Sequence, residues 1–200
     1  WCGSTMMRSE CATTLPAVRR GLEYLRRMQN PDGSFGVGLY SRNVGVCGLA
    51  GLAMMADGST PGRGPYGRAV DRALAFMSGC CRDSGFITHD ESASHGPMYE
   101  HGFATLFLAE AYGMARAAGL REKLSNAVRL IVETQNREGG WRYFPERRDA
   151  DISVTICQVM ALRSARNAGI RIPKEVIDNA VRYVRECQNP DGGFRYMRST

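Results

Sequence analysis

Two aspartates separated by one residue stand directly before an apolar run, in the segment DADI (149–152). A carboxylic acid can donate a proton to a substrate when it is kept neutral and is held by neighbouring hydrogen bonds. The same side chain can instead cap the helix that the apolar run predicts, by accepting hydrogen bonds from its first free N–H groups. The helix dipole and nearby arginines stabilise a charged carboxylate, so we interpret Asp151 mainly as an N-cap and secondarily as a proton donor.

A second polar segment, THDESASHGPMYEHGF (88–103), holds all three histidines of the chain. Glu100 and His101 lie where the following apolar run predicts the start of another helix, as Asp151 does in its own helix. Imidazole and carboxylate groups can bind zinc, but histidines six residues apart match no compact ligand motif. The pattern favours solvated loop histidines, and neither a metal nor another cofactor is expected.

The elements that must position these residues are internal repeats. A Gln, a Gly and a closing aromatic residue recur at fixed spacing in RGLEYLRRMQNPDGSF (20–35), NAVRLIVETQNREGGW (126–141) and NAVRYVRECQNPDGGF (179–194). A weaker copy, RALAFMSGCCRDSGF (72–86), has Cys80 in the place of the Gln. The four closing aromatic residues follow one another at intervals of 51, 55 and 53 residues, which indicates a repeat architecture.

Two kinds of helix alternate along this repeat. Amphipathic patterns predict half-exposed helices at 17–28, 121–134 and 174–187. Segments that are apolar on nearly every side, and therefore need cover on every side, lie at 44–55, 102–114 and 152–162. The alternation predicts an all-α fold of helical hairpins, in which outer helices cover inner helices that also face a central lumen.

Turn residues agree with these hairpins. The sequence NPDG at 30–33 and 189–192 fits type I turns. The prolines suited to the first turn of outer helices are Pro16 and Pro173. The glycines suited to C-terminal caps of inner helices are Gly58, Gly119 and Gly169.

Composition excludes several classes of protein. Hydrophobic residues make up 44% and charged residues 23%, as in ordinary folded domains, and no apolar run of about 18 residues predicts a membrane span. No secretory leader is visible, and the net charge of +6 comes largely from arginines spaced along helix faces, so nucleic acid is not an expected partner. The seven cysteines form no CxxC pair; they predict reduced, mostly buried thiols and favour a cytoplasmic location.

The repeats resemble those of the prenyltransferase and squalene-cyclase superfamily. RGLEYLRRMQNPDGSF matches its QW repeat with Phe in place of Trp, and QNREGGW (135–141) matches with Trp itself. The resemblance covers essentially the whole chain and implies an α/α toroid with chemistry inside the ring. It also implies that Gln29, Gln135 and Gln188 are scaffold residues, each bridging two helix ends beneath a stacked aromatic ring.

The resemblance suggests a chemistry as well. Squalene cyclases that act by protonation carry Asp-x-Asp-Asp at the start of an inner helix, with the middle Asp as proton donor. Asp149 and Asp151 match the first two acids, whereas Ile152 replaces the third, which belongs to the network that tunes the donor. Glu100 and His101 would lie at the same rim of the lumen. Other toroid proteins hold zinc through Asp, Cys and His, or use His and acids at the rim to cleave polysaccharides; no Asp-x-Cys accompanies the histidines here.

Residues 1–200 are interpreted as a single repeat domain, an incomplete ring of roughly three and a half hairpins. Because a closed ring of six hairpins of about 53 residues needs on the order of 300 residues, we expect a fragment of a longer toroid. Apolar surfaces at its open ends should promote self-association.

Two functions remain open from the sequence. The first is a terpene (squalene-hopene) cyclase-like domain that binds or cyclises an apolar isoprenoid in the lumen. If active, it would be a squalene-cyclase-type isomerase, an intramolecular transferase that uses acid-initiated cyclisation. The second is a non-catalytic α/α scaffold or binding module that has lost the complete acidic motif.

Overall fold

The structure is a computed structural model that describes residues 4–90, 95–115 and 117–198. In these residues it is all-helical, with isolated bridges in the turns and no strand. The helices are α1 (Ser4–Arg27), α2 (Val44–Ala56), α3 (Gly67–Gly79), α4 (Pro97–Tyr112), α5 (Leu120–Thr134), α6 (Ile152–Asn167) and α7 (Lys174–Glu186), with a short 3-10 turn at Gly38–Tyr40. None of the described helices is both long and apolar enough to cross a bilayer.

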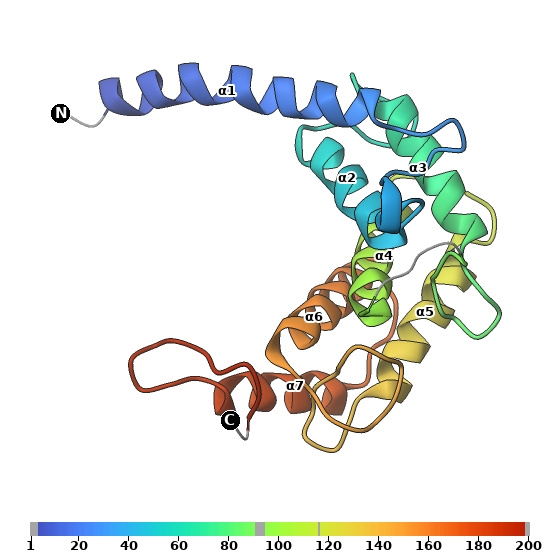
Figure 1. Ribbon diagram of the computed structural model, residues 1–200, viewed down its shortest axis with the longest axis vertical. Helices are drawn as coiled ribbons and strands as arrows, with labels where there is room; N and C mark the ends of the chain where they lie inside the picture. Colours follow the sequence, from blue (N-terminus) through green and yellow to red (C-terminus); the bar gives the residue numbers. More distant parts are fainter. Residues whose placement is uncertain (1–3, 91–94, 116, 199–200) are drawn as a thin grey trace.

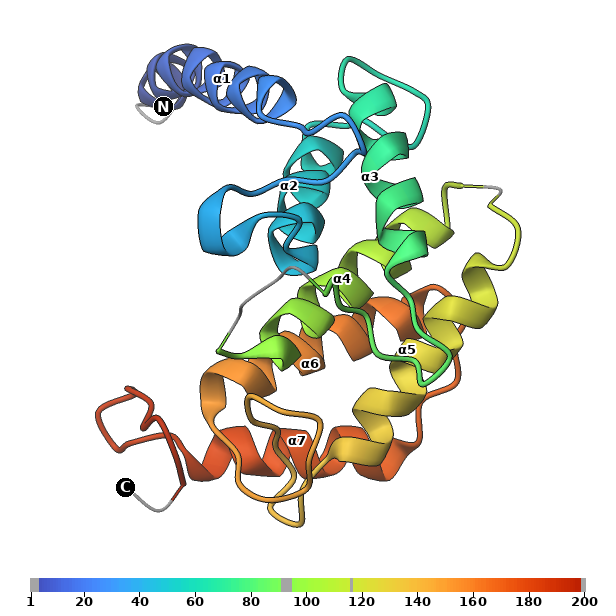
Figure 2. The ribbon, with the colours of Figure 1, turned by 45° about the vertical axis from the view of Figure 1, so that its right-hand side comes forward.

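The helices form two layers of an open arc. The inner helices α2, α4 and α6 pack on one another in that order, and α3, α5 and α7 pack behind them. Figure 1 shows the inner helices along the concave side of the arc, with α1 at one end and α7 at the other. The same arrangement seen in Figure 2 leaves α1 and α7 far apart. The described residues therefore form an α/α toroid segment that does not close.

Burial differs between the layers as the sequence predicts. Eleven residues of α4 are buried, whereas α7, at the end of the arc, buries only Val176, Ala180 and Tyr183. Among the described side chains of α1, Leu22 alone is buried. The apolar, all-round pattern thus corresponds to the more deeply buried helices, although Leu49 of α2 and Ile156 and Met160 of α6 remain exposed, and the amphipathic pattern corresponds to helices covered on one side.

The repeat glutamines tie successive outer helices together. Nε2 of Gln135 donates to the carbonyl oxygen of Gly139 in its own turn and to that of Val176 in the first turn of α7, both at 2.9 Å. Gln29 makes the same two kinds of bond, to its own turn at 3.0 Å and to the first turn of α3 at 2.9 Å. This geometry confirms that Gln29 and Gln135 are scaffold residues.

Glycines in the same turns allow close approach to the next outer helix. A Cβ added to Gly33, Gly85 or Gly139 would lie 2.3, 2.2 and 2.3 Å from a backbone carbonyl oxygen of that helix. All three also have positive φ, between 89° and 101°, which other residues adopt at a cost. The repeat requires Gly there for two independent reasons.

The last copy of the repeat has no helix to contact in the described residues. Gly192 has φ 88° but no atom within 4 Å of its added Cβ, and Phe194 is 52% exposed, against 1% for Trp141. The side chain of Gln188 is exposed and makes no hydrogen bond there. The turn at 188–194 therefore has the residues of the repeat contact but no outer helix among the described residues to pack against.

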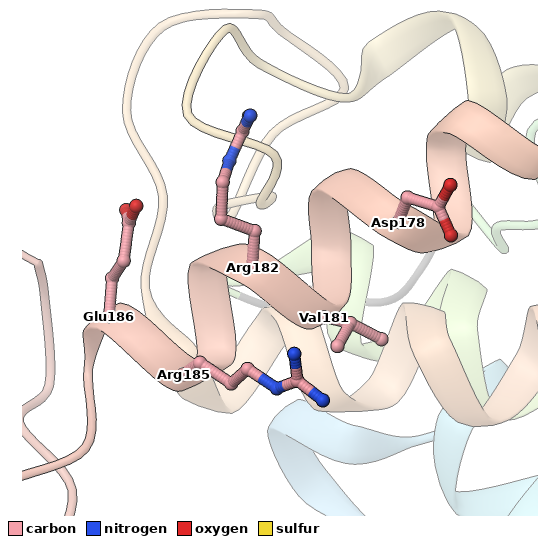
Figure 3. A pocket seen from close by; sticks show the side chains of 5 residues that line it. All are labelled: Asp178, Val181, Arg182, Arg185 and Glu186. Atoms are coloured by element: carbon pink, nitrogen blue, oxygen red, sulfur yellow. The ribbon is translucent and has the colours of Figure 1, made fainter.

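The neighbouring face of α7 is open in the same way. Figure 3 shows its side chains, which line a hollow of about 530 Å³ and all belong to α7: Asp178, Val181, Arg182, Arg185 and Glu186. On α5 the corresponding hollow has a second wall, the segment 169–173. Val181 is 40% exposed, whereas Val128, its counterpart one repeat earlier, is 3% exposed.

Three boundaries differ from the sequence prediction. α1 begins at Ser4, so Pro16 lies inside the helix and not in its first turn. The equivalent helix of the next repeat, α3, begins at Gly67, and α1 extends further than α3 toward the N-terminus of its repeat. α4 begins at Pro97 and not at 102, because its polar first turn is buried rather than solvated. Gly119 has φ 73° but directly precedes α5; α4 has already ended at Tyr112.

Candidate active site at the inner-helix rim

The first turns of the inner helices carry the polar residues of the candidate site. The N-cap residues of α2, α4 and α6 are Asn43, Gly96 and Asp151. Oδ1 of Asp151 accepts the backbone N–H of Val154 at 2.9 Å, and Oδ1 of Asn43 accepts that of Val46 at 3.0 Å. The predicted N-cap role of Asp151 is confirmed, and the first repeat performs it with an amide.

The two oxygens of Asp151 have different environments. The residue is completely buried. Oδ1 accepts a second hydrogen bond from Oγ of Ser153 at 2.6 Å, whereas Oδ2 is buried and has no hydrogen-bond partner among the described residues. A buried polar atom without a partner is unfavourable, and in a carboxylic acid it is the oxygen that can carry the proton without losing a hydrogen bond.

Ser153 links Asp151 to the neighbouring inner helix. Its Oγ is hydrogen-bonded to the hydroxyl of Tyr99. Ser153 lies two places after the N-cap of α6, and Tyr99 lies three places after the N-cap of α4. Burial is the main cause that raises the pKa of Tyr99 above its ordinary value, so its hydroxyl keeps the proton. A chain of two hydroxyl groups therefore connects α4 to the carboxyl group on α6.

Tyr99 also lines a pocket of about 440 Å³ between the first turns of α2 and α4, which we call the rim pocket. Its wall is mainly aromatic and aliphatic, including Leu39, Tyr40, Leu49, Tyr99, Phe103 and Tyr143. The rings of Tyr99 and Tyr143 are 6.0 Å apart between centroids. Such a wall suits an apolar ligand and attracts a positive charge to the faces of its rings.

The structure separates Asp149 from Asp151. Asp149 is exposed and pairs with Arg142, with an oxygen–nitrogen distance of 2.7 Å. The guanidinium of Arg142 lies 5.0 Å from the centre of the Tyr143 ring. Asp149 thus lies beside the site as half of a surface ion pair, and only Asp151 reaches the partly buried hydroxyl groups of Ser153 and Tyr99.

Glu100 and His101 point in different directions. Glu100 is 5% exposed and lines the rim pocket. His101 is fully buried and faces α5 instead: its Nδ1 accepts the N–H of Ile87 at 3.1 Å, and its Nε2 lies 3.2 Å from the carbonyl oxygen of Ala127. Nε2 must then carry the proton, and burial lowers the pKa of His101 to about 4. His101 is a neutral link between layers, away from the rim pocket.

The described residues contain no group of three or more His, Cys, Asp or Glu side chains that could hold a metal ion. The five cysteines whose side chains are described are all free, and four of them are buried. Burial raises the pKa of Cys47 and of Cys80 to about 12. These thiols are protonated at neutral pH and therefore are not nucleophiles.

Sequence reasoning missed the tyrosines of the site. Tyr99 and Tyr143 were not singled out, nor was Ser153. A signal was present for two of them, because Tyr99 and Ser153 both lie in the first turn of an inner helix, three places after the N-cap Gly96 and two places after the N-cap Asp151. Tyr143 lies in the turn that follows α5, where the repeat has no fixed residue.

Comparison with known proteins agrees with this geometry. The prenyltransferase alpha-alpha toroid domain matches the chain twice, over residues 6–142 and 71–199. The chain belongs to this family, whose members share the helical toroid seen here.

Two relatives of known activity are similar to this chain. A drimenyl diphosphate synthase of Streptantibioticus cattleyicolor is 29% identical over 185 residues, which cover 90% of this chain and 32% of that protein. A drimenyl diphosphate synthase of Streptomyces showdoensis is 29% identical over 181 residues, with the same coverage. The chain resembles terpenoid cyclases and spans about a third of the length of these relatives.

Proposed function

We propose that this chain supplies the acid and part of the cavity of a terpenoid cyclase that acts on a linear isoprenoid diphosphate. The observation that carries the proposal is Asp151: a buried carboxyl group with one oxygen free of partners, joined through Ser153 to a tyrosine of an apolar pocket. The relatives' names supply the diphosphate. Squalene, which lacks that group, is the substrate that the sequence alone suggested.

The chemistry would begin with proton transfer. The O–H bond of protonated Asp151 breaks as a C–H bond forms at one end of an alkene, whose π electrons make the new bond. The other alkene carbon becomes a cation, which the next double bond of the chain attacks to close a ring. In the last step a water molecule takes a proton from the carbon next to the final cation and the C–H electrons form a double bond, while Asp151, left as a carboxylate, takes up a proton from solvent.

The pocket wall suits such intermediates. The tyrosine rings Tyr40, Tyr99 and Tyr143 present π faces that stabilise positive charge. The aliphatic side chains Leu39 and Leu49 add no nucleophile that could capture the cation, whereas Asn43, His95 and Glu100 are polar groups of the same wall. The apolar part of the wall limits the contact of the cation with water, which would otherwise end the reaction early.

A second function, a non-catalytic scaffold or binding module, is favoured by one observation. Asp151 caps α6, and Asn43 performs the same capping in the first repeat without an acid. Ile152, where squalene cyclases have a third acid, offers no polar group to the site. In that case the repeats would keep their helix contacts and the carboxyl group would serve stability alone.

Turnover by the full-length protein separates the two functions. The protein is incubated with linear isoprenoid diphosphates of increasing chain length and, in parallel, with squalene, and cyclic products are sought by mass spectrometry. A cyclic diphosphate from the wild type, absent in Asp151→Asn, is expected. Equal product from both proteins would overturn the role of Asp151, and no product from any substrate would favour the scaffold.

A further inference from the structure

The carboxyl group of Asp151 is held by a directed chain of donors. Ser153 has a single hydroxyl hydrogen, and its Oγ lies 2.6 Å from Oδ1 of Asp151, which accepts it. The hydrogen bond between Tyr99 and Ser153 must then be donated by the tyrosine, since Ser153 has no second hydrogen to give. The order of donation is Tyr99 to Ser153 to Asp151.

We propose that Tyr99 and Ser153 are positioning residues that direct the acidic proton of Asp151 to Oδ2 and stabilise the carboxylate left after proton transfer. The inference rests on the proposed function and names residues that the repeat, the family match and the relatives' names do not assign. Neither hydroxyl exchanges its proton in this step: both remain donors while the negative charge develops on Asp151.

The geometry gives two physical reasons. Oδ1 already accepts hydrogen bonds from Ser153 and from the backbone of Val154, so a proton on Oδ1 would disrupt them, whereas Oδ2 has no bond to lose. When the proton leaves, the bond from Ser153 becomes charge-assisted and strengthens, and the bond from Tyr99 polarises it further. Because the whole group is buried, this stabilisation is little screened by water.

Tyr99 performs a second task at the same place. Its ring lines the rim pocket while its hydroxyl reaches Ser153 on the neighbouring helix. Burial raises the pKa of Tyr99, which keeps its O–H available as a donor over the neutral range. A single side chain therefore couples the wall that would hold the substrate to the group that would protonate it.

Three variants of the full-length protein test the proposal: Ser153→Ala, Ser153→Thr and Tyr99→Phe. We expect Ser153→Ala to lower kcat about 10- to 100-fold, the usual effect of losing a hydrogen bond to a charged group, with KM changed less than about 3-fold. Ser153→Thr keeps the hydroxyl and should restore kcat to within about 3-fold of the wild type. Tyr99→Phe keeps the ring in the pocket and should lower kcat more than it changes KM.

Ser164→Ala is the matched control, because it removes a hydroxyl from the same helix, hydrogen-bonded at 2.7 Å to Glu110 and outside the rim pocket. It should leave kcat unchanged, and circular dichroism should show all variants folded. If Asp151→Asn is inactive but Ser153→Ala retains the wild-type kcat, the positioning role is wrong while the proposed function stands. If Asp151→Asn equals the wild type, the proposed function fails and the positioning role falls with it. A loss in Ser153→Ala that appears in KM alone would also overturn the positioning role.

Discussion

Replacement of Gln135 by Ala should destabilise the fold far more than the same replacement of Gln188. Both glutamines have the same place in the repeat. Gln135 is 9% exposed and its amide donates to two carbonyl oxygens, whereas Gln188 is exposed and has no partner among the described residues. The two substitutions therefore compare a glutamine that bridges to the next outer helix with an equivalent glutamine that makes no such bridge among the described residues.

The magnitude follows from the two bonds. Each neutral hydrogen bond contributes about 1 kcal/mol net, and a buried carbonyl left without its donor costs about 1–3 kcal/mol. The carbonyl of Val176 is also a helix acceptor, so the larger penalty falls on Gly139. We expect Gln135→Ala to lower the free energy of unfolding by about 2–4 kcal/mol, and Gln188→Ala by less than about 0.5 kcal/mol.

Urea unfolding followed by circular dichroism measures both values. Gln135→Glu is the matched control, because it keeps the shape of the side chain and removes both N–H donors. It should be at least as destabilising as Gln135→Ala. Similar losses for Gln135→Ala and Gln188→Ala would refute the reasoning that the bridge to the next outer helix stabilises the array.

Three further predictions concern packing, pH and association. Gly139→Ala and Gly192→Ala both place a side chain at a positive φ, but only the Cβ at position 139 would meet a carbonyl oxygen, at 2.3 Å. Gly139→Ala should therefore lower the free energy of unfolding by about 2 kcal/mol more than Gly192→Ala in the same assay. Equal losses would contradict the close contact. Since the pKa of His101 falls to about 4 on folding, the unfolded chain takes up a proton below about pH 6.5 that the folded chain does not, and stability should drop by about 2 kcal/mol from pH 7 to pH 5. His101→Gln should reduce this loss of stability between pH 7 and pH 5. The same pH dependence in the variant and the wild type would contradict the role of His101. Ile156 and Met160 are 39% and 46% exposed on α6, so we expect concentration-dependent association in sedimentation velocity, reduced by Lys at either position; a monomer at every concentration would refute this.

The fold was predictable because the residues that the helix contacts require recur in several copies of the repeat. The Gln and the Gly with positive φ recur along the chain, and each has a visible physical reason in its contact with the next outer helix. The closing aromatic residue Trp141 instead donates from its indole nitrogen to the carbonyl oxygen of Ile131 in the preceding helix. The limits of α4 were less predictable. Its first turn is polar, and the apolar pattern used to find inner helices could not show that Glu100 and His101 are buried by hydrogen bonds and packing.

The site was predictable only in part. Asp151 could be found because a helix start and a carboxylate coincide there, and the same rule predicted its capping bond. The directions in which Glu100 and His101 point could not be predicted. Adjacent residues on a helix point about 100° apart, and the sequence does not say which one faces the lumen. Tyr143 belongs to a turn, and its approach to Tyr99 depends on how that turn folds back over α4.

The central claim is that Asp151 is an acid as well as a cap, and Asp151→Asn in the full-length protein tests it most directly. Asn is a cap of equal quality, and Asn43 already fills that role in the first repeat, so the free energy of unfolding should change by less than about 1 kcal/mol. Turnover of a linear isoprenoid diphosphate should fall by at least about 100-fold, the usual contribution of a general acid. Asp149→Asn, which alters only a surface ion pair, should lose far less. A folded Asp151→Asn protein that still forms the cyclic product at the wild-type rate would contradict the account.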